Sequence, residues 1–454
     1  MKKILILGAG PAGLSCGMEL SSNGYSGVIL EKNSKIGGLA KTIKFEENYY
    51  TFRTDIGPHR FFSKNKYIHS YISNILDDKW IDVKRSTMQY IDGKYFDYPI
   101  NPLQAFKNIG LIKTIKFCID YLKSVIIYII FKKKIETFEE YIFSKFGKSL
   151  AKFNITNYTE KVWGMSCKEL HPDWAKERIK GLSFFSVIKN MLFGINQTKS
   201  LVQYFKYPEN GTGEIYETIG EKICTTDFKI FENTYPIKII HNNNKIKKIE
   251  FKIKNLVKNI EPEHIISSIP ITEFISLMNP KPPIKILNAS KNLKWRSQVY
   301  LFITLNKKRV TKNQWIYFPN INIPFGRISE MKNFSKKMSP KNKTSILIEY
   351  FTWENDKIWK MNKEEIFELS LPFFEKMNFF KRSDVRKYYH FKKKFVYPVY
   401  ELNYKKNLKI IEKYLNSFSN LIYIGRPGKF KYTNQDQSIE MGINAAKKII
   451  NLTL

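Results

Sequence analysis

Cysteine and histidine are both scarce in this chain of 454 residues. The sequence contains four cysteines and six histidines. The cysteines lie far apart, with no CxxC pair, at Cys16, Cys118, Cys167 and Cys224. Such spacing excludes a disulfide framework and a zinc ribbon as the basis of the fold. The sequence therefore predicts a protein without a structural metal, held together by its hydrophobic core in a reducing cytosol.

Acidic residues are also in short supply. There are 41 Asp and Glu against 76 Lys and Arg, which gives a formal net charge of +35. A surplus of this size suits a nucleotide phosphate, an anionic membrane surface or a nucleic acid. The lysines are spread along the whole chain, and no recognisable nucleic-acid module gathers them into one stripe. We therefore expect no nucleic-acid partner.

No apolar run is long enough to span a membrane. The most apolar stretch, residues 124–131, is short, and Lys132, Lys133 and Lys134 follow it directly. A helix packed inside the protein is the commoner explanation for such a stretch. The alternative is an apolar face with a basic rim that makes peripheral contact with anionic lipid. We expect a cytoplasmic protein, with contact at the inner face of the membrane as the second option.

The chain opens with a nucleotide-binding pattern. An apolar strand at residues 3–7 is followed by Gly8, Gly10 and Gly13, and a second apolar strand ends at Glu31. Gly8 allows a tight turn, Gly10 lets backbone N–H groups approach a pyrophosphate, and Gly13 allows a helix to pack closely on the strand. Glu31 stands where an acid accepts a ribose hydroxyl. The pattern also places Pro11 and Ala12 beside the cofactor. Glycine and proline interrupt the apolar stretch, which argues against a secretory signal.

A second glycine pair follows the acid at Gly37 and Gly38, with Leu39 next. Glycines here leave room for a long cofactor that crosses the edge of the sheet. The pattern resembles FAD-binding flavoproteins of the amine-oxidase and protoporphyrinogen-oxidase type, and Gly37, Gly38 and Leu39 are expected to line the cofactor.

The chain is predicted to be interleaved rather than divided into successive domains. We expect an α/β fold in which residues 1–80, 211–280 and 401–454 form a Rossmann-type FAD-binding domain. Long periodic stretches, such as 138–153 and 174–193, predict a helical cap over residues 81–210. Strands are expected at 236–240, 246–251 and 264–270, the last returning to the first sheet. Alternating runs at 299–305 and 345–350 predict an antiparallel-sheet substrate domain over residues 281–400.

Several separated motifs in this frame resemble the UDP-galactopyranose mutase family. They are the segments 55–63, 157–164, 174–179 and 315–327. The resemblance implies catalytic roles for His59 beside the flavin and for Arg178 and Arg327 at the substrate diphosphate. It also implies that Gly57 contacts the cofactor and that Trp163 contacts the substrate.

The C-terminal motif over residues 425–438 is the most specific part of the resemblance. It implies further cofactor contacts for Gly425, Arg426, Gln435, Asp436 and Ser438, and substrate contacts for Tyr397, Tyr432 and Asn434. Arginine offers paired donors to phosphate, which suits these roles. Any one aromatic residue alone is more typical of a hydrophobic core. The ordered set as a whole favours a ligand site.

The resemblance implies an isomerase of the UDP-galactopyranose mutase type that acts on a nucleotide sugar in the biosynthesis of cell-envelope polysaccharide. Reduced FAD would form an adduct between flavin N5 and the sugar while the ring changes from pyranose to furanose, with NAD(P)H as a candidate reductant. One alternative is an FAD-dependent oxidoreductase that acts on a sugar nucleotide or an amine. Another is a non-catalytic flavin-binding scaffold. The sequence does not predict the oligomeric state.

Overall fold

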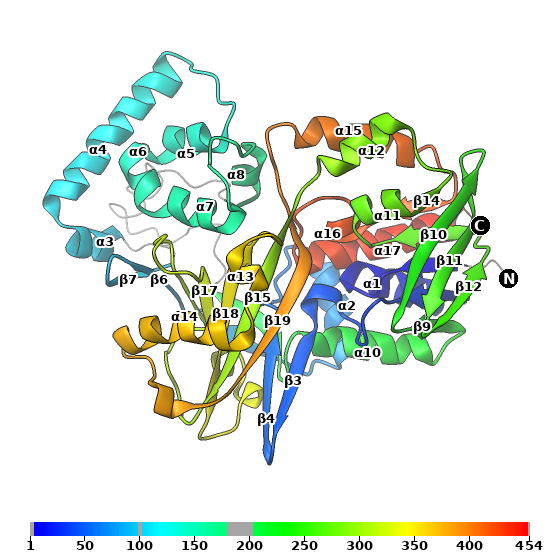
Figure 1. Cartoon of the computed structure of the whole chain (residues 1–454), viewed down its shortest axis with the longest axis horizontal. Helices are drawn as coiled ribbons and strands as arrows, with labels where there is room; N and C mark the ends of the chain where they lie inside the picture. Colours follow the sequence, from blue (N-terminus) through cyan, green and yellow to red (C-terminus); the bar gives the residue numbers. More distant parts are fainter. Residues whose placement is uncertain (1–3, 99–101, 179–202, 453–454) are drawn as a thin grey trace.

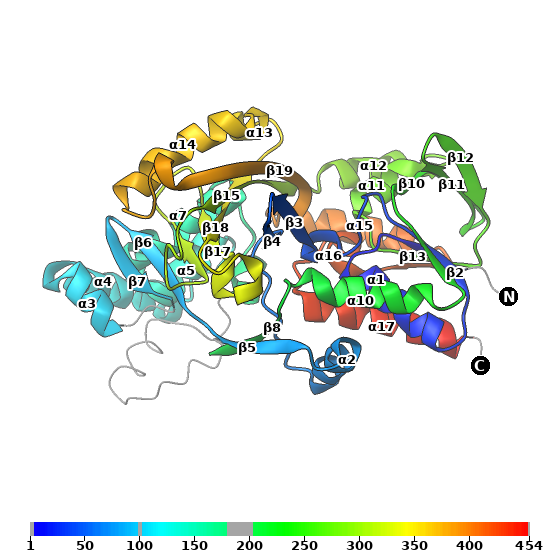
Figure 2. The same cartoon turned by 90° about the horizontal axis from the view of Figure 1, so that it is seen from below.

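The computed structural model describes residues 4–98, 102–178 and 203–452, apart from the side chains of residues 102, 103, 105 and 176–178. In Figures 1 and 2 a nucleotide-binding half that carries both chain ends lies at one end of the molecule, and a group of helices lies at the other. A large, mostly antiparallel sheet lies between them. The predicted α/β architecture with a Rossmann-type domain is confirmed.

A five-stranded parallel sheet forms the nucleotide-binding half. Its strands, in spatial order, are β20 (Leu421–Tyr423), β13 (His264–Ser267), β1 (Ile4–Leu7), β2 (Gly27–Leu30) and β9 (Phe228–Phe231). Strand β1 is apolar and buried at every position, as expected where helices cover both faces of a parallel sheet. The predicted return of the segment after residue 264 to the first sheet is confirmed, because Ile4 pairs with His264.

Helices far apart in the sequence pack together on this sheet. Helices α1 (Pro11–Ser22) and α17 (Gln435–Asn451) lie side by side, with α10 (Gly213–Cys224) next to α1 (Figure 1). A Cβ atom on Gly442 would lie 2.2 Å from the carbonyl oxygen of Ala12. The close approach of α1 and α17 therefore requires glycine at this position.

Smaller elements surround the parallel sheet. A four-stranded sheet has the order β12 (Leu256–Ile260), β11 (Lys245–Ile253), β10 (Thr234–Asn242) and β14 (Met278–Asn279). The nearby helices are α2 (Lys66–Leu76), α11 (Ile271–Leu277), α12 (Ile284–Lys291), α15 (Tyr404–Leu415) and the short α16 (Gly425–Gly428). The strands expected at 236–240 and 246–251 correspond to β10 and β11.

The central sheet has seven strands. Their order is β19 (Val385–Pro398), β15 (Trp295–Leu305), β18 (Thr344–Thr352), β17 (Arg327–Glu330), β16 (Trp315–Tyr317), β6 (Thr87–Ile91) and β7 (Lys94–Asp97). The predicted antiparallel pairing is confirmed for β15 with β18. Strands β6 and β7 join this sheet although they fall within the range expected to form the helical cap. The exact domain limits stay a prediction.

The remaining strands form two pairs, and α13 (Lys357–Lys360) and α14 (Lys363–Lys376) contact the large sheet. The pairs are β3 (Thr42–Glu47) with β4 (Tyr50–Asp55), and β5 (Trp80–Lys84) with β8 (Tyr204–Pro208). Helix α14 begins with a capping box in which Asn362 and Glu365 exchange backbone hydrogen bonds. This arrangement satisfies N–H groups that a helix start leaves unpaired.

The helical region contains α3 (Pro102–Ile109), α4 (Leu111–Val125), a π-helical turn η2 (Ile126–Ile130), α5 (Phe138–Phe146), α6 (Lys148–Leu150), η3 (Ala151–Thr156), α7 (Asn157–Trp163) and α8 (Asp173–Arg178). The predicted helicity of 138–153 is confirmed, whereas most of 174–193 lies outside the described residues. The expectation that the apolar stretch 124–131 packs inside the protein is wrong. Ile129, Ile130 and Phe131 are 63%, 64% and 76% exposed. Among the described helices, none has the length and apolar character needed to cross a bilayer.

Candidate active site

The turn between β1 and α1 has the geometry that its glycines predict. A Cβ atom on Gly13 would lie 2.0 Å from the carbonyl oxygen of Gly8, so only glycine permits this contact between helix and strand. A Cβ atom on Gly10 would instead meet nothing closer than Gly38 Cα, at 3.8 Å. Gly10 is the N-cap of α1, and Pro11 and Ala12 form its first residues. The N–H groups of this helix start are a ready site for an anion.

Glu31 is fixed beneath this turn. Its side chain is nearly buried, and its carboxylate accepts hydrogen bonds from the backbone N–H groups of Ala9 and Asn33, both at 2.9 Å. These bonds hold the acid at the end of β2, beside the glycine turn. The carboxylate retains lone pairs beyond those it uses here, which suits a ribose hydroxyl donor.

The second glycine pair lies against the first. Gly37 and Gly38 both have positive φ, at 97° and 58°, a conformation that strongly favours glycine. The N–H of Gly37 donates to the carbonyl oxygen of Ala9 at 2.8 Å. Leu39 follows in the short helix η1 (Gly38–Ala40) and packs on the core beneath the large sheet. The two predicted cofactor segments therefore form one continuous surface.

The C-terminal segment meets the same surface. Gly425 has a φ of 74°, and a Cβ atom on it would lie 3.1 Å from the Cβ of Ala12. Three of the predicted ligand-binding residues in this segment also make hydrogen bonds within the protein. Asn434 caps α17, the Gln435 side chain accepts a hydrogen bond from the Tyr216 hydroxyl at 2.7 Å, and the Ser438 hydroxyl bonds that of Thr433.

The residues at this edge fit a flavin dinucleotide. The position above Gly10 is open to the close approach of a diphosphate. In the part of the chain that the structure describes, Oδ1 of Asp436 and Oγ of Ser267 are buried without hydrogen-bond partners. Ser267 ends β13, and ligands of parallel α/β sheets bind at the carboxyl ends of the strands. Buried polar atoms of this kind call for a partner, which a bound cofactor can supply.

An arginine and a glutamate form a buried pair in the central sheet. Arg327 begins β17 and lies opposite Glu349 of β18. Its Nε and one terminal nitrogen donate to the two carboxylate oxygens at 2.6 and 2.7 Å. The Glu349 side chain is fully buried, and the Arg327 side chain is 14% exposed. The paired bonds fix the plane of the guanidinium and leave other N–H groups free to bind a ligand.

The loop that carries His59 lies above this pair. A Cβ atom on Gly57 would lie 3.6 Å from a terminal nitrogen of Arg327 and 3.4 Å from Oε2 of Glu349. His59 Nε2 lies 3.0 Å from the carbonyl oxygen of Ile56. Burial, together with the charges of Arg426 and Arg327, lowers the pKa of His59 to about 4. The imidazole is therefore neutral at pH 7, and Nε2–H donates to the carbonyl.

Arg426 closes the site on the other side, next to two tyrosines. Its guanidinium carbon lies 4.8 Å from the ring centre of Tyr432 and 5.4 Å from that of Tyr397. Its nitrogens also donate to the backbone carbonyls of Thr433 and Val396. Arg426 therefore shapes the C-terminal segment and also places a positive charge near His59.

The aromatic residues of the site form one group. The Tyr397 and Tyr432 rings are stacked with centres 5.8 Å apart, and the Trp163 ring lies 5.9 Å from Tyr397. Trp174 contacts both Trp163 and Tyr432. The buried Nε1 of Trp163 has no hydrogen-bond acceptor among the described residues. The structure thus brings Trp163, Tyr397 and Tyr432 together with Arg426. The side chain of Arg178 lies outside the described residues.

Sequence reasoning missed two residues of this site. Glu349 could have been noticed, because it is a lone acid within the apolar run Ser345–Tyr350, where a carboxylate needs a partner. Lys161 carries no such signal. The three N–H groups of its ammonium are shared among four backbone carbonyls, those of Phe318, Asn320, Ile323 and Phe325. It thereby joins α7 to the loop that leads into Arg327.

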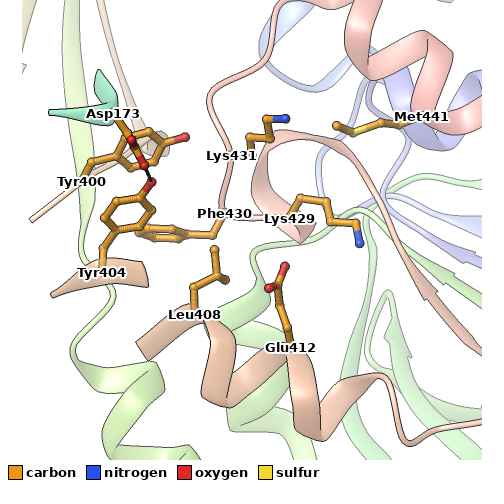
Figure 3. Close-up of a pocket in the computed structure, with 9 residues that line it drawn as sticks. All are labelled: Asp173, Tyr400, Tyr404, Leu408, Glu412, Lys429, Phe430, Lys431 and Met441. Atoms are coloured by element: carbon orange, nitrogen blue, oxygen red, sulfur yellow. Dashed lines mark hydrogen bonds between the residues drawn. The ribbon is translucent and has the colours of Figure 1, made fainter. Parts of the chain in front are cut away.

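A separate hollow of about 500 Å³ lies beside the C-terminal segment (Figure 3). Lys429, Lys431, Glu412 and Tyr400 are among the residues that line it. Tyr400 links it to the site, since its hydroxyl accepts from the backbone N–H of Tyr432 at 2.8 Å. None of the predicted site residues lines this hollow. It therefore lies behind the aromatic group rather than within the site.

Two family models match this chain. A sequence model described as "UDP-galactopyranose mutase" matches residues 153–383, just over half of the chain, and one described as "NAD(P)-binding Rossmann-like domain" matches residues 6–75. The first match contains Trp163, Arg327 and Glu349. The second contains the glycine motifs and His59.

Individual relatives are distant. A probable UDP-galactopyranose mutase of Klebsiella pneumoniae is 22% identical, over 99% of this chain and 95% of that protein. An L-amino-acid oxidase of Sistrurus catenatus edwardsii is also 22% identical, over 72% of this chain, which spans only 64% of the length of that oxidase. A crystal structure of reduced UDP-galactopyranose mutase has the same fold, with a TM-score of 0.83 and 22% identity over 100% of this chain and 94% of that one.

Proposed function

Because the chain belongs to the UDP-galactopyranose mutase family, we propose that it is an FAD-dependent mutase that interconverts the pyranose and furanose forms of UDP-galactose. The observation that carries the proposal is the convergence of Arg327, Arg426 and His59 beside the aromatic group. Two cations beside stacked tyrosines suit a substrate with a diphosphate and flat or ring-shaped parts. An uncharged amine would need no such pair of arginines.

The residues that would hold FAD are the glycine turn, Glu31, the pair Gly37 and Gly38, and Gly425 with the start of α17. The reduced flavin, when bound, supplies the nucleophile for the anomeric carbon, so the protein needs no nucleophile of its own. His59, held neutral, would support the flavin without adding a charge to it. Dithionite or NAD(P)H would serve as the reductant.

Arg327 would bind the substrate diphosphate and stabilise it as it leaves. A guanidinium carries five N–H groups, and the pairing with Glu349 uses two of them. The remaining groups are available to phosphate oxygens, and the fixed plane of the guanidinium lets them act without reorganisation. Trp163, Tyr397 and Tyr432 would position the uridine and the sugar, and Arg178 would add a second cation to the diphosphate.

The direct test is to purify the protein, record its visible spectrum and incubate it with UDP-galactofuranose after reduction by dithionite. We expect bound flavin, and formation of UDP-galactopyranose only in the reduced enzyme, without net consumption of an oxidant. Bound flavin with oxidation of an amine or a sugar nucleotide would instead identify an oxidoreductase. Bound flavin with no turnover of any sugar nucleotide would identify a non-catalytic scaffold.

Lys161→Met is expected to lower kcat/KM by about 100-fold while flavin stays bound. Without its ammonium group, the loop before Arg327 loses the donor for four carbonyls, and a shift of about 1 Å at a reacting centre costs about this much. Steady-state kinetics and limited proteolysis at residues 319–325 would measure the change. Lys332→Met is a matched control, because Lys332 also donates to several backbone carbonyls. Equal losses in both variants would mean a general loss of folding.

A further inference from the structure

The outermost helix of the helical region has a long apolar face that none of the described residues covers. Helices α3 and α4 and the turn η2 form the end of the molecule farthest from the two chain termini (Figures 1 and 2). Ten large apolar side chains from residues 111–131 are between 44% and 85% exposed. They are Leu111, Ile112, Ile115, Ile119, Leu122, Ile126, Ile127, Ile129, Ile130 and Phe131. Monomeric soluble proteins rarely expose an apolar patch of this kind without a function for it.

The exposed face is a regular feature of the helix. Its central residues, Ile112, Ile115, Ile119, Leu122, Ile126 and Ile129, follow one another at alternating steps of three and four. This spacing places them in a single stripe along the helix. The opposite side packs on the protein through Phe117 and Ser124, which are 8% and 5% exposed. The helix therefore has one side that packs on the protein and a separate apolar side that faces solvent.

The charges around this stripe are almost all positive. Residues 104–134 contain seven lysines and one acid, Asp120, whose carboxylate accepts a hydrogen bond from Ser149. Lys133 and Lys134 pair with Glu140 and Glu136. Within the described ranges, no ion pair holds the other five lysines, at positions 107, 113, 116, 123 and 132. The stripe is thus bordered by free ammonium groups.

Two kinds of occupant could cover such a stripe, and the charges distinguish them. Steps of three and four also suit a coiled coil with a second copy of the chain. A second copy, however, would bring the same lysines to the contact and no acids to pair with them. Lys116 and Lys123 lie seven residues apart on the same side of the helix, where like charges would meet like charges. An anionic lipid surface offers hydrocarbon for the stripe and negative charge for the lysines together.

We propose that α4 and η2 dock this protein on the surface of an anionic lipid bilayer, with the helix axis in the plane of the interface. The apolar stripe inserts between headgroups, and the free lysines contact the lipid phosphates. The nucleotide-binding half lies at the opposite end of the molecule (Figure 1). Docking through α4 therefore leaves the cofactor edge of the parallel sheet in water.

The test is the flotation of purified holoprotein with vesicles of phosphatidylcholine alone and of phosphatidylcholine with phosphatidylglycerol. We expect binding to the anionic vesicles and much weaker binding to the neutral ones. The double variant Ile119→Glu with Leu122→Glu should lose at least about tenfold in affinity. Affinity for the anionic vesicles should fall about fivefold in each of the variants Lys113→Gln, Lys116→Gln and Lys123→Gln, because one lysine near an anionic surface contributes about 1 kcal/mol.

The net charge of +35 could attract any face of the protein to anionic vesicles. The double variant Leu256→Glu with Val257→Glu controls for this general attraction. It introduces the same charges at apolar residues of β12 that are 62% and 61% exposed. If this control loses as much binding as the α4 variant, α4 is not the docking surface. Failure of the wild type to float with anionic vesicles would also overturn the proposal. Light scattering gives a further test. If the wild type is a dimer and only the α4 variant is a monomer, the stripe binds a second copy of the chain and the proposal is overturned. The flavin spectrum of each variant reports that it is folded.

Discussion

Arg327→Met is expected to lower kcat/KM by about a thousandfold, the largest effect on activity of any single change to this site. The variant removes the N–H groups that would bind the leaving diphosphate, and loss of one preorganised donor alone costs about 100-fold to 1,000-fold. It also leaves Glu349 buried without its partner, which lowers the free energy of unfolding by about 3–5 kcal/mol. Steady-state kinetics and urea unfolding would measure the two effects separately.

Two further variants separate these effects. Glu349→Gln keeps the arginine but removes the charge that fixes its plane, so kcat/KM should fall while flavin stays bound. Arg382→Met is the matched control, because Arg382 also donates two hydrogen bonds to a single carboxylate, that of Glu368, but on an exposed surface. It should change neither activity nor unfolding, because exposed ion pairs contribute little. Full activity in Arg327→Met would contradict the proposed role.

Gly10→Ala is expected to leave the protein folded and to weaken the binding of FAD by about 10-fold to 100-fold. The added Cβ would meet only Gly38 Cα at 3.8 Å, so the protein itself tolerates it. The space that it fills is the approach to the backbone N–H groups, and losing one hydrogen bond to a charged group costs this much affinity. The fluorescence of flavin that dissociates on dilution would measure its binding, and circular dichroism would measure whether the protein is folded.

Gly13→Ala provides the contrast. Its Cβ would lie 2.0 Å from the carbonyl oxygen of Gly8, so β1 and α1 would have to move apart. We expect this variant to lose its folded structure, with or without added flavin. If Gly10→Ala bound flavin as tightly as the wild type, the diphosphate would lie elsewhere.

The nucleotide-binding half could be predicted because its signals are local. The strand, the glycine turn and Glu31 lie within residues 3–31, and each glycine has one physical reason to be there. The return of β13 to the first sheet followed from the apolar run after residue 264. Both inferences needed only neighbouring residues and the known requirements of a parallel sheet.

The central site was harder to predict because its contacts join distant residues. Lys161 donates to the carbonyl of Phe325, 164 residues away, and carbonyls have no sequence signature. The prediction that the apolar stretch 124–131 packs inside the protein failed for another reason. Periodicity shows that a helix has apolar residues, but it cannot tell which of two apolar sides the protein covers. Motif resemblance placed Asn434 and Gln435 at the ligands, which stays a prediction; the hydrogen bonds that both side chains also make within the protein had no signal in the sequence.

The strand order of the parallel sheet sets the time at which this protein can acquire its cofactor. Strand β1 is made first, yet its neighbour β13 and the edge strand β20 come more than 250 and 400 residues later. Helix α17, which packs on α1 through Gly442, follows α1 by more than 400 residues and is made after both strands. A growing chain therefore carries an incomplete flavin site until α17 has been made. For the same reason, a gene cut at any point between β1 and α17 would give two fragments that need each other before either can hold the dinucleotide.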